Sequence, residues 1–244
     1  MKKIESIIAF GGSHIAGCEL NDIKITEYYK NNNSFLINDN ITKEFAYPNK
    51  LAKMLNVPCY NYAMSAGSND RSLRLLPKAV LDHPNSLVLF GWTNSFRKEF
   101  FRPEKTHVAQ DLDQFVQVGI HLYNIKNPYK ELLDSISIDK NSINKTYVEK
   151  IAYPYNNLEV YSFYVEAVCQ LYSSKCYHLL DNGNEKLPDS LKNKFMFEGF
   201  DNFEDWCEFK KFKKFEANHY EEKAHIELAN LIYKDLMKKV DIDF

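Results

Sequence analysis

The sequence predicts a three-layer α/β/α protein built on a flavodoxin-like, doubly wound and mainly parallel sheet of about five strands. Two observations lead to this fold class: short apolar runs that end at or near glycine, and amphipathic stretches that alternate with them along the chain. A third is the length of 244 residues, which suffices for one large domain with a sizeable core. We therefore expect a single domain over residues 1–244, with insertions near 18–42 and 95–156.

The strands are predicted from apolar runs of a few residues. Residues 6–10, Ser-Ile-Ile-Ala-Phe, form a continuous run that stops at Gly11, which is typical of a strand buried on both faces. The remaining strands are expected at residues 58–63, 86–90 and 175–180.

The helices are predicted from apolar positions that recur at helical spacing. The stretch 157–174 shows this most clearly, because its apolar and aromatic residues repeat at helical spacing: Tyr161, Tyr164, Val165, Val168, Leu171 and Tyr172. Ser68 or Asn69 is expected to cap the helix that follows the second strand. The other helices are expected at residues 47–56, 109–124, 143–151 and 220–238. Residues 185–215 carry no clear period, and no element is predicted there.

Composition and charge argue against several classes of protein. A formal net charge of −2 and a pI of about 6.4 argue against a nucleic-acid or anionic-membrane partner. No apolar run reaches the 18 or so residues that cross a bilayer, and Glu5 interrupts the weak likeness of the N-terminus to a signal peptide. We therefore expect a cytoplasmic protein, or one packaged in a virus particle. Five cysteines without CxxC spacing predict free thiols and no zinc site.

Glycine is scarce, and its positions are informative. The chain has 8 glycines, where average usage would give roughly 17. Five of the eight lie where the first three predicted strands end, at Gly11, Gly12, Gly17, Gly67 and Gly91. Ligands of a doubly wound sheet bind at this edge, so we expect the functional site there.

Four short blocks occur at or after these positions in a recognisable order. They are Gly11-Gly12-Ser13-His14, Ser65-Ala66-Gly67, Gly91-Trp92-Thr93-Asn94 and Glu216-Ala217-Asn218-His219. This order resembles that of the SGNH (GDSL-like) hydrolase family. The family has a Gly-Asp-Ser turn after strand one, a glycine after strand two, a Gly-x-Asn turn after strand three and a histidine near the C-terminus.

The resemblance implies roles for individual residues. Ser13 would be the nucleophile and His219 its base, while the backbone N–H groups of Ser13 and Gly67 and the amide of Asn94 would form the oxyanion hole. The chain departs from the family pattern at three places. Gly12 replaces the aspartate of the first block, the third block is one residue longer, and Glu216 stands where the family has aspartate. Glu216 is the first choice for the acid that orients His219, with Asn218 or a main-chain carbonyl as alternatives.

The activity implied by the resemblance is cleavage of a carboxylic ester through an acyl-serine intermediate, without metal or other cofactor. A short acyl group on a carbohydrate or other polar small molecule is the expected substrate. His14, Trp92 and Arg97 are candidates for substrate binding, although each also suits a purely structural or solvated position. His225 is expected to pack or to form a hydrogen bond on the last helix.

Three other functions remain open at this point. An acyltransferase would use the same acyl-serine step, with a sugar hydroxyl in place of water as acceptor. A catalytically silent binding or structural protein would keep the scaffold without the reaction. A nucleotide-binding flavodoxin-like domain would hold phosphate at residues 11–17.

Overall fold

The computed structural model describes residues 3–18, 20, 42–64, 67–93, 98–101, 115–118, 158–181, 186–191, 193–215 and 219–239. Its central sheet has four parallel strands in the order β2-β1-β3-β6. The strands are β1 (Ser6–Phe10), β2 (Cys59–Asn61), β3 (Ser86–Trp92) and β6 (Lys175–Leu180). All four coincide with predicted strands to within two residues at each end.

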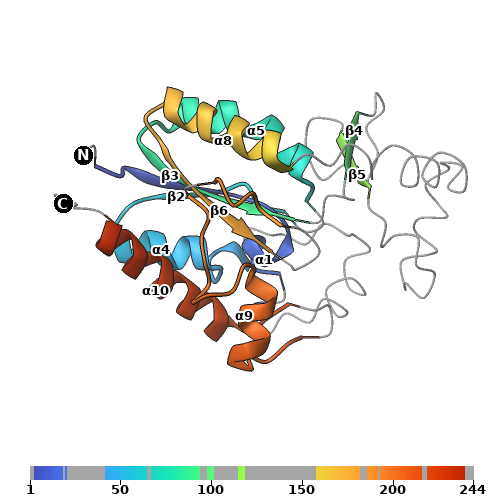
Figure 1. Ribbon diagram of the computed structural model, residues 1–244, viewed down its shortest axis with the longest axis vertical. Coiled ribbons are helices and arrows are strands. Elements are labelled where there is room, and N and C mark those ends of the chain that lie inside the picture. Colours follow the sequence, from blue (N-terminus) through green and yellow to red (C-terminus); the bar gives the residue numbers. More distant parts are fainter. Residues whose placement is uncertain are drawn as a thin grey trace, which may run out of the picture.

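Helices cover both faces of this sheet, as the prediction of three layers requires (Figure 1). One layer contains α4 (Tyr47–Leu55) and α10 (Glu222–Lys239), and the other contains α5 (Asn69–Asp82) and α8 (Leu158–Leu171). Along β1, Ile7 and Ala9 pack in the core on the α4 side, whereas Ile8 and Phe10 pack on the α5 side. Because successive side chains of a strand point to opposite faces, a run without polar residues fits a strand covered on both sides. The three-layer α/β/α prediction is confirmed.

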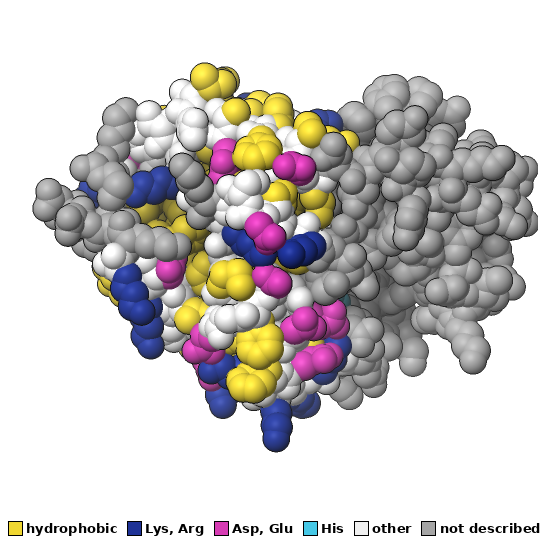
Figure 2. Space-filling model, viewed as in Figure 1, with side chains coloured by type: hydrophobic (Ala, Val, Ile, Leu, Met, Phe, Trp, Pro, Cys, Tyr) yellow, Lys and Arg dark blue, Asp and Glu magenta, His cyan; other side chains and the backbone are white. Residues whose placement is uncertain are grey.

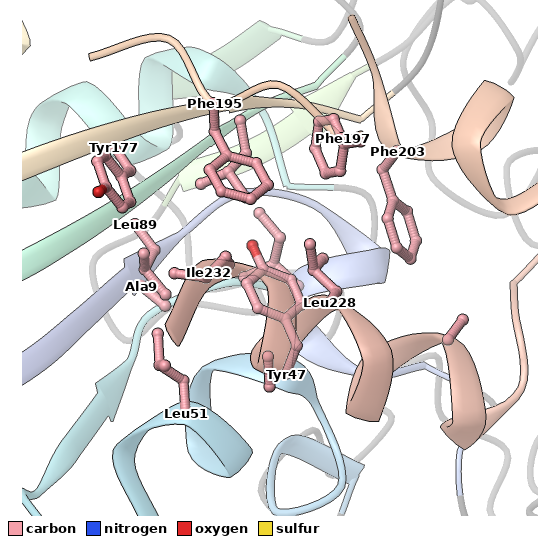
Figure 3. Close-up of a cluster of buried hydrophobic side chains, with 14 of the residues drawn as sticks. Ala9, Tyr47, Leu51, Leu89, Tyr177, Phe195, Phe197, Phe203, Leu228 and Ile232 are labelled. Atoms are coloured by element: carbon pink, nitrogen blue, oxygen red, sulfur yellow. The ribbon is translucent and has the colours of Figure 1, made fainter. Parts of the chain in front are cut away.

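The core on the α4 side is built from residues distant in sequence (Figure 3). Leu51 on α4 and Leu228 and Ile232 on α10 face Ala9 and Leu89 of the sheet, and all five side chains are fully or almost fully buried. The first and last thirds of the chain therefore enclose the same apolar layer. This arrangement brings the segment before α10 close to the end of β1.

One expectation about the sheet differs from the structure. The described residues contain four strands of the main sheet, where about five were expected. At the outer edge of β6, the fifth position holds a single parallel bridge between His178 and Lys194. Beside it, the Phe195 N–H donates to the His178 carbonyl at 2.9 Å.

The helix predicted over residues 109–124 is wrong at residues 115–118. These residues form β5 (Phe115–Val118), which pairs antiparallel with β4 (Lys98–Phe101). Two of the four residues are β-branched valines, which favour strands, and their partner strand lies too far away in sequence for a periodicity argument to detect. The helix predicted over 143–151 lies outside the described residues.

Two helices occur where none was predicted, α1 (Ser13–Ala16) and α9 (Phe203–Lys210). The Asn202 side chain caps α9 by accepting a hydrogen bond from the Asp205 N–H at 2.9 Å. Asparagine is a preferred N-cap residue, so the sequence did carry a signal for this helix.

The predicted free thiols are confirmed, because all five cysteines are unbridged. None of the helices in the described part of the chain is long and apolar enough to cross a membrane. On the face shown in Figure 2, acidic and basic side chains are interspersed among apolar ones.

Candidate functional site

The first block forms a tight turn that places Ser13 directly after β1. Gly11 has a φ of 145°, and a Cβ at this position would lie 2.8 Å from the Gly91 carbonyl oxygen. Only glycine adopts this conformation without strain and leaves that space free. The turn leads into α1, whose first residue is the half-buried Ser13. The serine therefore stands at the carboxyl end of a central strand.

The second block lies against the first. The Met64 N–H donates to the Gly11 carbonyl at 3.2 Å, and a Cβ on Gly67 would lie 2.9 Å from the same oxygen. Because Gly67 has no Cβ, the backbone of the second block can lie directly against the first turn. The N–H of Gly67, however, donates to the Met64 carbonyl at 2.9 Å. A role of this N–H in an oxyanion hole stays a prediction, and it requires this turn to open.

The third block is joined to the first by packing and to the second by hydrogen bonds. Gly91 leaves room for Ile15 of α1, whose Cδ1 would be only 1.7 Å from a Cβ at position 91. Thr93 is the residue after β3, and its backbone forms two hydrogen bonds with the side chain of Asn69, each 3.0 Å long. The three strand ends are therefore held together by direct contacts.

The fourth block brings His219 to the residue next to Ser13. The ring centroids of His219 and His14 lie 5.2 Å apart with the rings edge to face, and His219 is 7% exposed. The rings of Phe203 and Tyr220 also contact His14, at 5.5 and 6.0 Å between centroids. The fold therefore places His219, from the far end of the chain, beside the turn that carries Ser13. A hydrogen bond between Ser13 and His219 stays a prediction.

His225 occupies the structural position that was expected of it. Its Nδ1 accepts a hydrogen bond from the Tyr47 N–H, in the first turn of α4, at 3.3 Å. The pKa of His225 is lowered to about 3, chiefly by burial and to a smaller extent by the nearby His219 and Lys50. His225 is therefore neutral at pH 7 and ties α10 to the start of α4.

Trp92 is not a substrate platform, because it is 0% exposed. Its Nε1–H donates to His178 Nδ1 at 3.1 Å, and its ring packs against Phe90 with 4.5 Å between centroids. The alternative expectation, a core residue, is the right one. His14 is half-buried among aromatic rings, and its role in substrate binding stays a prediction.

Four predicted site residues lie outside the described residues: Asn94, Arg97, Glu216 and Asn218. Their roles as oxyanion donor, substrate-binding residue and acid stay predictions. Among the described residues, no group of three or more His, Cys, Asp or Glu side chains is placed to hold a metal ion.

The described residues also line a pocket of about 340 Å³ away from the predicted site. It lies along the first residues of β6, and its lining includes Glu166, Lys175 and Cys176. No predicted site residue contributes to this lining. Ser13, at the carboxyl end of β1, and His219 lie apart from this pocket.

Asn69 is the residue of this region that the sequence did not single out for the site. It was considered only as a helix cap, yet its side chain reaches across to β3. No local pattern identifies such a contact, since the two partners are 24 residues apart.

Comparison with known proteins finds a distant structural likeness and no match in sequence. No family model and no curated protein matches the chain. Among solved structures, the chain is similar to a carbohydrate esterase whose active site is described as having divergent catalytic and non-catalytic binding functions. The identity is 13% and the TM-score 0.43, over 99% of this chain and 70% of the other. A likeness of this size does not establish an activity for this chain.

Proposed function

We propose that this protein is a serine hydrolase that cleaves a carboxylic ester, with Ser13 as nucleophile and His219 as general base. The observation that carries the proposal is the meeting of these two blocks at one edge of the sheet. Ser13 begins α1 after β1, and His219 contacts the adjacent His14 at 5.2 Å between ring centroids. A serine hydroxyl becomes a useful nucleophile only when a base can accept its proton, and His219 is the histidine predicted for that task.

In the proposed reaction, Ser13 Oγ attacks the ester carbonyl while His219 takes the hydroxyl proton. The tetrahedral intermediate collapses to an acyl-serine, and the leaving alcohol receives the proton from His219. Water then attacks the acyl group, His219 again accepts the proton, and the acid product leaves with Ser13 restored. Donors for the oxyanion would be the Ser13 N–H, the Asn94 amide and the Gly67 N–H once it is released from Met64. Glu216 would orient the His219 ring.

The substrate we propose is a short acyl ester of a carbohydrate or another polar small molecule. The sequence supports this through the polar character of residues 18–42, which follow β1. An acyltransferase shares every step up to the acyl-serine. Product analysis with and without an acceptor sugar separates the two, because only a transferase forms the acylated acceptor.

The test of the proposal is hydrolysis of p-nitrophenyl acetate by the full chain and its Ser13→Ala and His219→Ala variants. Each substitution should lower kcat by at least about 10³-fold, since nucleophile and base act as a unit. Ser72→Ala is a matched control, because Ser72 is a buried serine whose Oγ bonds within its own helix, to the Ser68 carbonyl at 3.3 Å. A fluorophosphonate should label Ser13 covalently, as located by peptide mass spectrometry.

Two results would overturn the proposal. One is a hydrolysis rate that is equal in wild type and Ser13→Ala. The other is labelling that persists after Ser13 is replaced.

A further inference from the structure

Asn69 makes a two-point contact with the end of the central strand β3. Its Nδ2 donates to the Thr93 carbonyl and its Oδ1 accepts from the Thr93 N–H, each at 3.0 Å. Both residues are buried, with exposed fractions of 4% and 2%. The side-chain amide of Asn69 therefore serves both the donor and the acceptor of the Thr93 backbone, as a neighbouring strand would.

This contact is not needed to cap α5. The cap is Ser68, whose Oγ accepts from the Arg71 N–H at 3.2 Å. The Asn69 side chain is therefore not the N-cap, which is the usual role of an asparagine at the start of a helix. Its side chain instead joins the segment that carries Gly67 to the residue that precedes Asn94 in the sequence.

We infer that Asn69 is a positioning residue for the oxyanion side of the site, an inference that rests on the proposed function. By holding both backbone groups of Thr93, it fixes the direction in which the chain leaves β3 toward Asn94. Because Gly67 lies two residues before Asn69, the same contact also fixes the position of Thr93 relative to Gly67. Oxyanion donors act only when they are held in place before the charge develops, and a displacement of about 1 Å can lower a rate about 10²-fold.

The experiment compares kcat and KM for p-nitrophenyl acetate in Asn69→Ala, Asn69→Asp and the matched variant Ser72→Ala. Ser72 lies on the same helix and is also buried, but its hydroxyl donates to the Ser68 carbonyl at the start of that helix instead of reaching β3. Rates are normalised to the amount of active enzyme by fluorophosphonate titration, so that a smaller folded fraction does not count as slower catalysis. Asn69→Asp keeps the acceptor for the Thr93 N–H, and it carries the same test where Asn69→Ala does not fold.

We expect kcat to fall about 10–100-fold in Asn69→Ala with KM changed less than about threefold. The loss in Asn69→Asp should be smaller, and Ser72→Ala should stay within about twofold of wild type. In an Asn94→Ala background, adding Asn69→Ala should lower kcat by less than about a further threefold. The reason is that the effects of two residues that act through one another do not add.

Two results would overturn the positioning role while leaving the hydrolase in place. They are an unimpaired kcat in Asn69→Ala, and an equal loss with and without Asn94. Absence of Ser13-dependent hydrolysis in the wild type would overturn both this inference and the proposed function.

Discussion

Replacing Gly91 with alanine should disrupt the packing between β3 and the turn that carries Ser13. A Cβ at this position would lie 1.7 Å from Ile15 Cδ1, 3.1 Å from Ile15 Cγ1 and 3.2 Å from the Phe10 carbonyl oxygen. Gly91 is not among the residues with positive φ, so the conflict concerns space and not backbone strain. Since Ile15 is 1% exposed, its end methyl group has to displace neighbouring atoms in order to move.

The expected cost follows from overpacking of a close-packed interior. An extra methyl group of this kind destabilises by about 1–3 kcal/mol. For a chain of this size, each kcal/mol lowers Tm by about 2–4 °C, so Gly91→Ala should melt about 2–12 °C below wild type. Because Ile15 belongs to α1, its displacement would also move α1. The rate of ester hydrolysis should therefore fall together with stability.

The assay is thermal unfolding followed by circular dichroism, with a rescue variant as control. Ile15→Val removes the conflicting Cδ1 and should cost about 0.5–1.5 kcal/mol by itself. Combined with Gly91→Ala, it should restore part of the lost Tm, because the closest contact is gone. Losses that simply add in the double variant, or a Gly91→Ala Tm within about 1 °C of wild type, would refute the argument that Ile15 occupies the space beside Gly91.

Three further predictions concern stability and thiol reactivity. Burial lowers the pKa of His178 and that of His225 to about 3, while the unfolded chain keeps values of about 6.5. Between these pH values the unfolded state binds more protons, so stability is complete above pH 6.5 and falls on acidification by about 1.4 kcal/mol per pH unit for each histidine. Urea midpoints from pH 7 to 4 should show this slope, and an equally steep slope in His225→Gln would contradict it. Asn202→Ala should cost about 1 kcal/mol through loss of the α9 cap, with Asn202→Asp close to wild type in thermal unfolding. Cys59 is half-buried and its pKa is raised to about 12 by burial, so a disulfide reagent at pH 8 should titrate the native thiols slowly and all five quickly in denaturant. A thiol that reacts at once in the native protein would contradict this prediction.

Much of the fold could be predicted from the sequence because its signals are local. The run Ile7-Ile8-Ala9-Phe10 lacks polar residues because both faces of β1 are covered. The helices α4, α8 and α10 begin and end close to the predicted limits, and α5 begins at the predicted cap, since each needs one apolar face toward the sheet. The pairing of β4 with β5 was missed, because it depends on residues that only the folded chain brings together.

The site is predictable only in outline. The glycine positions pointed to one edge of the sheet, and Gly11 and Gly67 do meet there. That this edge carries the functional site stays a prediction. The burial of Trp92 could not be predicted, because an aromatic residue at a strand end fits a core as well as a pocket. Its complete burial and its hydrogen bond to His178 on the neighbouring strand settle the question.

The sequence by itself determined the layered fold, the free thiols and the edge of the sheet where a site was expected. Periodic burial and the backbone demands of tight turns are properties of short segments, so they can be recognised without knowledge of the neighbours. Tertiary structure alone decided that His219 contacts His14 and that Asn69 holds Thr93. These contacts join residues from separate elements, and the packing of those elements against the sheet, not the spacing along the chain, sets the distances between them.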